Sequence, residues 1–148
     1  MSKIRVAKES DFETVLDLMA IYYAEDDYAF DRSLGREALT QLCNAEHLGR
    51  LWVLIDEGRV VGYMAVTLGF SLEYQGRDAF IDEIFIGESA RSRGLGTMAM
   101  ETAESFCRQA GVRALHLEVE GHREGAQALY QKRGFVELPR LRMSKVLT

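Results

Sequence analysis

Residues 84–97 read IFIGESARSRGLGT. The apolar residues at the start of this stretch are typical of the end of a buried strand, and the two glycines near its end precede a segment with helical periodicity. A polar loop with two arginines lies between them. The stretch therefore predicts a strand, a loop and a helix in direct succession, with the helix running from about residue 95 to about residue 109.

The junction between loop and helix has the properties of an anion site. The first N–H groups of a helix lack intrahelical acceptors, and the helix dipole adds partial positive charge at the same place. Gly94 and Gly96 carry no side chain, so a phosphate can approach the backbone closely. Arg91 and Arg93 add charge, and the hydroxyl of Thr97 adds a donor. Together these features predict a pyrophosphate ligand.

A dinucleotide is the first alternative for this ligand. Residues 94–99, GLGTMA, also fit G-x-G-x-x-[GA], and Glu118 lies about twenty residues farther on, where a ribose-binding acid would sit. However, the Rossmann glycines follow their strand almost directly and open their domain, whereas here a polar loop intervenes and only about a third of the chain remains. Two arginines also crowd the approach. No G-K-[ST] follows the glycines, so a Walker A loop is excluded.

The whole chain has the composition of one globular domain, residues 1–148. It is 47% hydrophobic and 28% charged, with no apolar run long enough to span a bilayer. The first residues lack the apolar region of a signal peptide, so we expect a cytoplasmic protein that does not bind membranes. Cys43 and Cys107 lie far apart without a zinc-ligand spacing, and we expect no metal.

Charge is distributed unevenly. The net charge is −5; residues 1–78 hold 8 basic and 14 acidic residues, and the remaining residues hold 10 and 9. This acidic balance argues against nucleic acid as a partner. It is compatible with a cationic ligand on the first half and an anionic ligand on the second, and equally with a solvated acidic surface.

Two motifs resemble those of a known family. Residues 91–96, RSRGLG, fit the acyl-CoA signature [RQ]-x-x-G-x-[GA] of the GNAT superfamily of N-acetyltransferases, and residues 126–135, AQALYQKRGF, resemble its A-x-x-x-Y-x-x-x-G-F closing motif. Residues 51–67 resemble the family's central hairpin, and residues 115–119 resemble the strand that splays from its neighbour.

The resemblance and the periodicity together predict an α/β fold of the GNAT type. Its sheet should be mixed and mainly antiparallel, with six or seven strands flanked by helices in the order βααβββαβαββ. Strands 79–86 and 114–119 should be parallel neighbours, because the intervening helix makes a crossover connection. The expected strands are residues 3–8, 51–55, 60–67, 79–86, 114–119, 135–137 and 141–146. The expected helices cover residues 10–23, 34–44, about 95–109, and a short segment around residues 126–130.

The resemblance implies which residues bind coenzyme A. In GNAT enzymes the strand before the glycine loop hydrogen-bonds pantetheine through its backbone, and the pyrophosphate lies on the loop and helix start. Many members carry Asn three residues before the alanine of the closing motif, whereas this chain has Arg123. Its guanidinium can donate hydrogen bonds as the amide does but cannot accept them, so the resemblance leaves undecided whether Arg123 contacts a phosphate. The predicted cofactor-binding residues are Ile84, Phe85, Ile86, Arg91, Ser92, Arg93, Gly94, Leu95, Gly96, Thr97, Arg123 and Ala126.

Three residues are candidates for catalysis. Tyr130 has the place of the family tyrosine near the thioester sulfur, and its alternative role is that of a core aromatic. An acceptor amine must lose a proton before it attacks, and Asp82 and Glu83 precede the pantetheine strand. Residues 81–86, IDEIFI, resemble the L-E-D-[LF]-[YF]-V run of the diamine and polyamine acetyltransferase branch. In that branch the first acid is the favoured base, and the resemblance maps this role to Asp82. Adjacent strand residues face opposite sides, so we expect different roles for the two acids; structural hydrogen bonds are the alternative.

Residues 22–28, YYAEDDY, connect the first two expected helices. Aromatic faces beside carboxylates suit a cation. In GNAT folds this connection often borders the acceptor pocket, and a solvated loop with aromatic anchors is the alternative. The predicted acceptor-binding residues are Tyr22, Glu25, Asp26 and Asp27.

The sequence therefore predicts an acetyl-CoA-dependent N-acetyltransferase. We expect a small cationic amine as acceptor, direct attack in a ternary complex, and a homodimer. Two alternatives stay open: acetylation of a protein lysine or N-terminus, and acyl-CoA binding without turnover. The sequence leaves the acceptor and the length of the acyl group undetermined.

Overall fold

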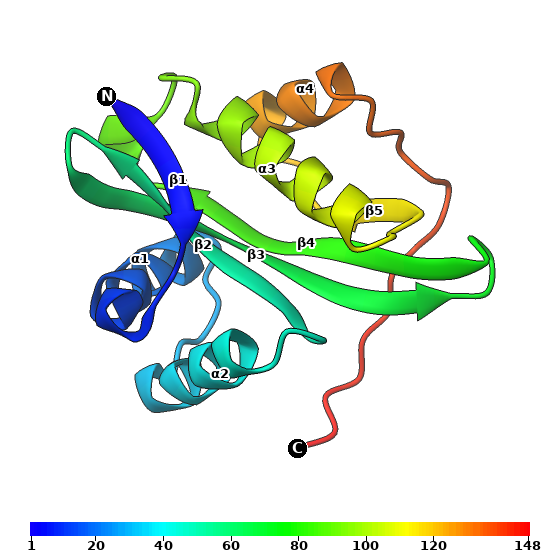
Figure 1. Cartoon of the computed structure of the whole chain (residues 1–148), viewed down its shortest axis with the longest axis horizontal. Coiled ribbons are helices and arrows are strands. Elements are labelled where there is room, and N and C mark those ends of the chain that lie inside the picture. The colour runs from blue at the N-terminus through cyan, green and yellow to red at the C-terminus, as the bar shows by residue number, and fades with distance from the viewer. The chain divides into compact units, whose positions relative to one another are not determined.

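The computed structural model describes residues 1–148 as two compact units, residues 1–118 and residues 119–148. Each unit is described by itself. The first unit is a single mixed sheet with helices on both faces (Figure 1). Helices α1 (Phe12–Glu25) and α2 (Arg32–Asn44) cover one face, and helix α3 (Leu95–Gln109) covers the other.

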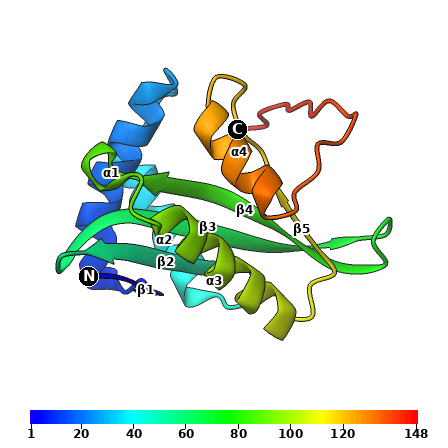
Figure 2. The same ribbon diagram turned by 90° about the horizontal axis from the view of Figure 1, so that it is seen from above.

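The sheet has five strands in the spatial order β1-β2-β3-β4-β5. The first four strands pair antiparallel, and β4 and β5 are parallel neighbours joined by α3, which confirms the predicted crossover. Figure 2 shows β3 and β4 projecting beyond β2 as a long hairpin. The strands are β1 Ser2–Val6, β2 Gly49–Asp56, β3 Arg59–Ser71, β4 Gly76–Ile86 and β5 Ala114–Leu117.

Both faces of the central strands are buried, which explains the continuous apolar run in β2. On the α1 face, Val15 and Leu16 are fully buried and pack in one core with Val53, Tyr63 and Phe85. On the other face, the Trp52 ring of β2 meets the Phe106 ring of α3 edge to face, with centroids 5.2 Å apart. Burial of each such side chain contributes about 1.5–3 kcal/mol, so the helices are held by packing on both faces.

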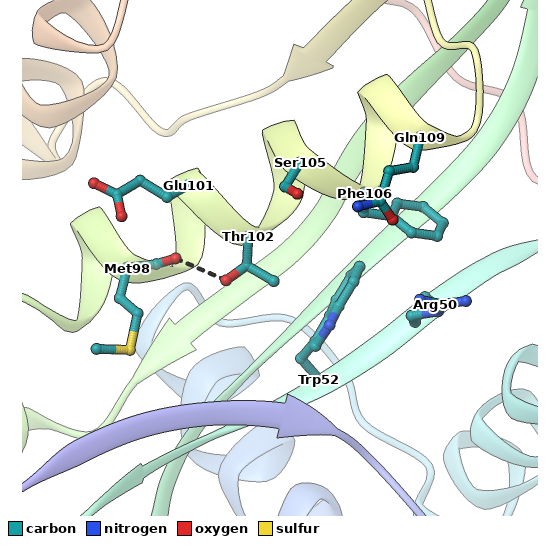
Figure 3. A pocket seen from close by; sticks show the side chains of 8 residues that line it. All are labelled: Arg50, Trp52, Met98, Glu101, Thr102, Ser105, Phe106 and Gln109. Atoms are coloured by element: carbon teal, nitrogen blue, oxygen red, sulfur yellow. Dashed lines mark hydrogen bonds between the residues drawn. The ribbon is translucent and has the colours of Figure 1, made fainter.

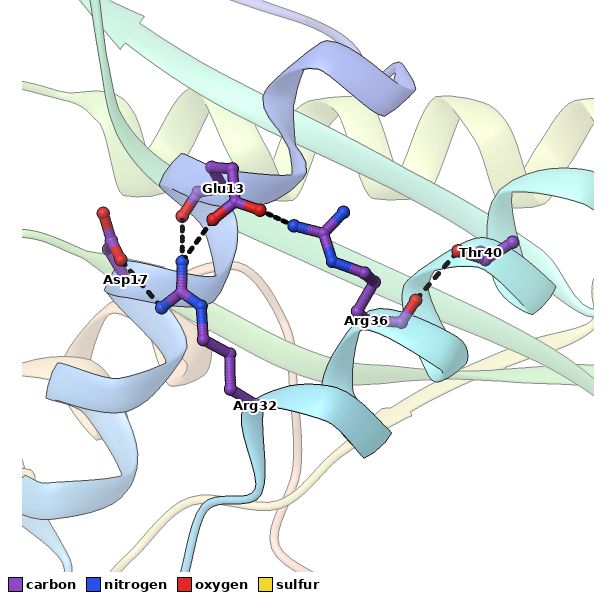
Figure 4. A network of polar contacts seen from close by, with 5 residues as sticks. All are labelled: Glu13, Asp17, Arg32, Arg36 and Thr40. Carbon is purple, nitrogen blue, oxygen red and sulfur yellow. Dashed lines mark hydrogen bonds and ion pairs between the residues drawn. The ribbon is translucent and has the colours of Figure 1, made fainter.

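Ion pairs join α1 and α2 at their exposed side (Figure 4). Arg32 bridges Glu13 at 2.6 Å and Asp17 at 2.9 Å, and Arg36 pairs with the same Glu13. Exposed pairs contribute roughly 0–1 kcal/mol each. The start of α2 is capped by Asp31, whose side chain accepts a hydrogen bond from Leu34 N at 2.9 Å.

One irregularity of β4 matters for the site. Ala65 pairs with Glu83 and Val66 pairs with Ile81, so Asp82 is an extra residue opposite two consecutive residues of β3. Such a β-bulge interrupts the strict alternation of side chains along a strand. By its pairing, Glu83 lies on the face that α1 covers, and Ile81 lies on the face of α3.

The second unit contains helix α4 (Glu124–Lys132), which ends before Gly134 at φ +96°. This helix and its stop agree with the sequence prediction. The Tyr130 and Phe135 rings pack edge to face at 6.1 Å.

The predicted strands at residues 135–137 and 141–146 are wrong, because neither segment enters a sheet. The sheet therefore has five strands, fewer than the six or seven expected, and the order of elements ends at α4. Alternation describes which residues could share a face, but a strand forms only where its backbone finds a partner. Pro139 removes one donor from this segment, and Leu141 and Val146 are 93% and 85% exposed.

Two short 3-10 turns complete the fold, Glu9–Asp11 before α1 and Glu88–Ala90 after β4. No helix of the structure combines the length and the apolar character that crossing a bilayer requires.

Candidate active site

The phosphate loop, as we name residues 87–94 between β4 and α3, is open where it meets the helix. Gly94 is the N-cap of α3 with φ +83°, and no side chain caps the helix there. A Cβ built on Gly94 meets no atom within 4 Å, so the space beside this backbone is open. Ser92 also has positive φ, at +63°. The loop thus exposes the first N–H groups of α3, as phosphate binding requires.

The pairing of β4 with β5 ends before this loop. It covers only Asp78 to Ile81 and ends at Leu117, the last residue of β5, while β4 continues to Ile86. Residues 83–86 therefore pair with β3 along one edge and carry no strand of the first unit along the other. This edge includes residues 84–86, whose backbone the family resemblance assigns to pantetheine.

Arg91 connects the two predicted ligand regions. Its Nε donates to the Ile86 carbonyl at 2.8 Å, and its terminal nitrogen lies 3.4 Å from the Glu25 carboxylate. Its guanidinium lies over the Phe85 ring at 5.6 Å, and that ring stacks on Tyr22 at 5.1 Å. The structure thus brings Arg91, Phe85 and Ile86 of the cofactor set together with Tyr22 and Glu25 of the acceptor set.

Arg93 takes a different direction and pairs with Asp56 at 2.9 Å. The predicted residues Ser92 and Thr97 are exposed, Gly96 is half-buried, and Leu95 is buried under the start of α3. Leu95 therefore offers a ligand its backbone rather than its side chain.

Glu83 is held by two tyrosines. Tyr23 of α1 donates to Oε2 of Glu83, and Tyr63 of β3 donates to Oε1 at 2.7 Å. Each carboxylate oxygen keeps further lone-pair capacity, so the group can still accept a proton from a ligand. The carboxylate is fixed in direction and positioned on the α1 face of the sheet, two residues beyond the last pair of β4 with β5.

The surroundings raise the pKa of Glu83 above its ordinary value, chiefly because burial disfavours the charged form. The two tyrosine hydrogen bonds act in the opposite direction, and the charge of Asp82 raises the pKa further. Burial and the nearby Glu83 also raise the pKa values of Tyr23 and Tyr63, so both phenols remain protonated donors at neutral pH.

Asp82, the other predicted acid, is exposed. As the bulge residue, it lies outside the regular pairing of β4 with β3. Its charge nevertheless reaches Glu83 and Tyr23. The two acids thus occupy different environments, one solvated and one half-buried and oriented.

The acceptor segment divides in two. Tyr22 and Glu25 lie in the last turn of α1 beside Phe85 and Arg91, as described above. Asp26 and Asp27 follow the end of the helix, and Asp27 adopts φ +57°. The structure therefore places Tyr22 and Glu25 against the end of β4.

Three predicted residues belong to the second unit. Arg123 is the N-cap of α4, and Ala126 and Tyr130 lie one turn apart on that helix. Residues four apart share a helix face, so the structure brings these two together.

Two functional candidates escaped the sequence prediction. Tyr63 lies in the middle of an apolar strand, where it resembles a core aromatic, and Tyr23 follows the selected Tyr22. The only local signal was the aromatic pair at residues 22–23, since the contacts with Glu83 span 60 and 20 residues.

A groove between α3 and β2 lies apart from these residues (Figure 3). Trp52 and Arg50 reach it from β2, and Arg50 lies 4.8 Å above the Phe106 ring. None of the predicted catalytic or binding residues lines it. The other lining residues are Met98, Glu101, Thr102, Ser105 and Gln109.

Comparison with known proteins gives the family. Residues 13–135 match the model of the acetyltransferase (GNAT) family. The chain is 27% identical over 134 residues to the uncharacterized N-acetyltransferase YhfO of Bacillus subtilis, covering 90% of this chain and 89% of that protein. An integron cassette protein from the mobile metagenome of Cole Harbour Salt Marsh is 33% identical, with a TM-score of 0.87 over 98% of this chain and 90% of its own.

A predicted acetyltransferase of Clostridium acetobutylicum, solved with acetyl-CoA, shares the fold at 12% identity, with a TM-score of 0.82 over 98% and 96% of the two chains. The matched segment of 123 consecutive residues extends from the first turn of α1 to just beyond the end of α4. The chain belongs to the GNAT family and is an acyl-CoA-dependent acetyltransferase.

Proposed function

We propose that this enzyme moves acetyl from acetyl-CoA to the primary amine of a small cationic molecule, with Glu83 as the general base. The observation that supports this role best is the position of the Glu83 carboxylate. It is half-buried and held between the hydroxyls of Tyr23 and Tyr63, two residues beyond the last pair of β4 with β5. A base must be oriented and near its proton donor, and the two tyrosine hydrogen bonds fix the direction of the Glu83 carboxylate.

The residues present fit coenzyme A. The open space at Gly94 and the uncapped start of α3 suit its pyrophosphate, and the unpaired edge of residues 84–86 suits its pantetheine. Acetyl-CoA supplies the activated thioester when bound. The chain supplies orientation, a base and a proton donor.

The acceptor reaches the enzyme as an ammonium, which has no lone pair. Glu83 accepts the proton, directly or through water, and its raised pKa makes it a stronger base than an ordinary carboxylate. The neutral amine then attacks the thioester carbonyl. As the carbon–sulfur bond breaks, we propose that the Tyr130 phenol protonates the departing thiolate. The second proton that the attacking nitrogen loses, as it becomes the amide, then returns through water to restore the phenol.

Direct attack within a ternary complex follows from the cysteines. Cys107 is buried and burial raises the pKa of its thiol to about 11, whereas Cys43 has its pKa raised by burial on α2. A raised thiol pKa disfavours the thiolate that a covalent acetyl-enzyme needs, and this favours direct attack. Initial-rate plots against both substrates should intersect, and parallel plots would contradict the scheme.

A small cation is favoured by the charges near Glu83. The charge of Asp82 reaches Glu83, and the Tyr22 ring stacks on Phe85, two residues farther along β4. The diamine and polyamine branch, suggested by residues 81–86, is one class within this proposal. Acetylation of a protein lysine is the competing assignment.

The test is turnover of acetyl-CoA with a panel of diamines, polyamines, amino sugars and lysine peptides, using wild type, Glu83→Gln and Asp82→Asn. We expect small amines to be preferred and Glu83→Gln to lower kcat by about 10²–10⁴-fold, the usual contribution of acid–base catalysis. Affinity for acetyl-CoA should persist in both variants. A larger loss from Asp82→Asn would make Asp82 the base, and preference for peptides would favour a protein acceptor.

A further inference from the structure

Asp56 is the last residue of β2, and its carboxylate accepts hydrogen bonds from two residues that are far apart in the sequence. Oδ1 accepts from the Ser2 hydroxyl of β1 at 2.8 Å, and Oδ2 accepts from Arg93 at 2.9 Å. The residue is 7% exposed, unlike most acids of the chain. Both partners lower its pKa, Ser2 most strongly, so Asp56 is ionised at neutral pH.

The contact with Arg93 is one of three that tie the phosphate loop to the sheet. Gly87 N donates to the Val61 carbonyl at 2.8 Å at the start of the loop, and Arg91 donates to the Ile86 carbonyl in its middle. Near its end, only the Arg93–Asp56 pair reaches across to β2. This last tie lies one residue before Gly94, where the loop passes into α3.

The end of the loop needs such a tie. Ser92 and Gly94 flank Arg93 with positive φ, a conformation that a non-glycine residue such as Ser92 adopts at a cost. An unsupported loop would spend time in other conformations and would have to be ordered by its ligand. Order that exists before binding raises affinity, because the ligand no longer bears that entropic cost.

We propose that Asp56 is a positioning residue for acetyl-CoA: through Arg93 it holds the phosphate loop in its binding conformation without touching the ligand. Arg93 is 54% exposed and has five N–H donors, of which Asp56 engages one nitrogen. The remaining donors can face a phosphate while the guanidinium stays oriented. The inference rests on the proposed use of this loop for coenzyme A.

On charge alone, the removal of Asp56 would strengthen phosphate binding, because Asp56 partly neutralises Arg93. Two features decide against it. The Arg93 guanidinium is exposed, so solvent screens the charge that it would regain without Asp56. The loss of the ion pair, in contrast, leaves a loop segment with two positive-φ residues without its contact to β2. Removal of Asp56 should therefore weaken binding.

The experiment measures the Kd of acetyl-CoA by calorimetry and kcat and KM by turnover for Asp56→Asn, Arg93→Met and the double variant. We expect each single variant to raise Kd and KM for acetyl-CoA by roughly five- to thirty-fold, the effect of losing one modest interaction. The kcat should stay within about twofold. Because Asp56 acts through Arg93, the double variant should be no worse than Arg93→Met.

Glu57→Gln is the matched control, since Glu57 is the adjacent acid of the same turn and contacts the N-terminus instead of the loop. It should leave Kd unchanged. Unchanged or tighter binding by Asp56→Asn, or additive losses in the double variant, would overturn the inference. Arg93→Met keeps the test valid if Asp56→Asn folds poorly, because Arg93 is exposed. If wild type itself does not bind acetyl-CoA, the proposed function fails instead.

Discussion

The phenol oxygen of Tyr63 lies 2.7 Å from Oε1 of Glu83, across the two central strands β3 and β4. Tyr63 itself pairs with Phe85, so the hydroxyl reaches diagonally along the sheet to the carboxylate. Tyr63 is 1% exposed, so water competes little for this bond. A hydrogen bond to the charged form stabilises that form, so Tyr63 limits how far burial raises the pKa of Glu83.

Tyr63→Phe should therefore shift the pH profile of the enzyme. Loss of the hydroxyl removes a contact that lowers the pKa of Glu83, so this pKa should rise further. Because the base must be ionised, the acidic limb of kcat/KM should move to higher pH, with a several-fold loss below the limb and a smaller change on the plateau. Tyr74→Phe, which alters an aromatic near His116 instead, should leave the limb in place. A limb unmoved in Tyr63→Phe would argue against Glu83 as the titrating base.

Glu83→Gln should make the protein more stable at neutral pH. The pKa of Glu83 is higher in the folded than in the unfolded state, so between these two values the folded state binds more protons and stability falls as pH rises. An ionised Glu83 therefore costs stability above this window, and the amide avoids that cost. Melting temperatures should exceed wild type by a few °C at pH 7–8, with the difference shrinking at about pH 4 and below. A lower melting temperature at pH 7 would show that the tyrosine hydrogen bonds outweigh desolvation.

Gly94→Glu should abolish tight binding of acetyl-CoA. Its side chain would enter the open space beside the start of α3 and bring negative charge to the phosphate site. Strain alone must be separated from this effect, because φ is +83°. Gly111→Glu is the control, since Gly111 has φ +74°, equally open surroundings and a place just after the other end of α3. Calorimetry should show at least a tenfold weaker Kd for the first variant only; equal binding by both would refute the phosphate assignment.

Tyr130→Phe should lower kcat and leave acetyl-CoA affinity nearly unchanged. The variant keeps the ring that packs against Phe135 and removes only the hydroxyl, so α4 should retain its structure. Loss of a general acid costs about 10²–10⁴-fold. Single-turnover kinetics, in which chemistry limits the rate, give the measurement. Full activity would assign Tyr130 to packing, and a loss of cofactor binding would assign it to positioning.

The parts of the site that the sequence predicted are those coded within a few residues. The strand end at Ile86, the glycine at Gly94 and the start of α3 follow one another directly, so local rules for strands, turns and helix starts were enough. The parallel pairing of β4 and β5 was also predictable, because the intervening helix permits only a crossover.

The tyrosine pair around Glu83 was not predictable by such rules. Tyr23 reaches Glu83 from a helix sixty residues earlier, and the side of the sheet that Glu83 faces depends on the bulge at Asp82. No local pattern marks that bulge. The prediction of two C-terminal strands was wrong for a related reason. Alternation indicates which residues of a segment could share a face, whereas the presence of a neighbouring strand to pair with depends on the whole fold.

The bulge places Asp82, a residue with no partner position on β3, directly beside Glu83 in the sequence. Without this residue, Ile81 and Glu83 would be consecutive and would keep the opposite faces they now have, so neither core depends on what stands between them. Asp82 is exposed, yet its charge reaches Glu83 and Tyr23. Its side chain therefore acts on the electrostatics of the proposed acceptor site from an exposed position outside both cores, which makes it the first position to randomise when a new amine is sought.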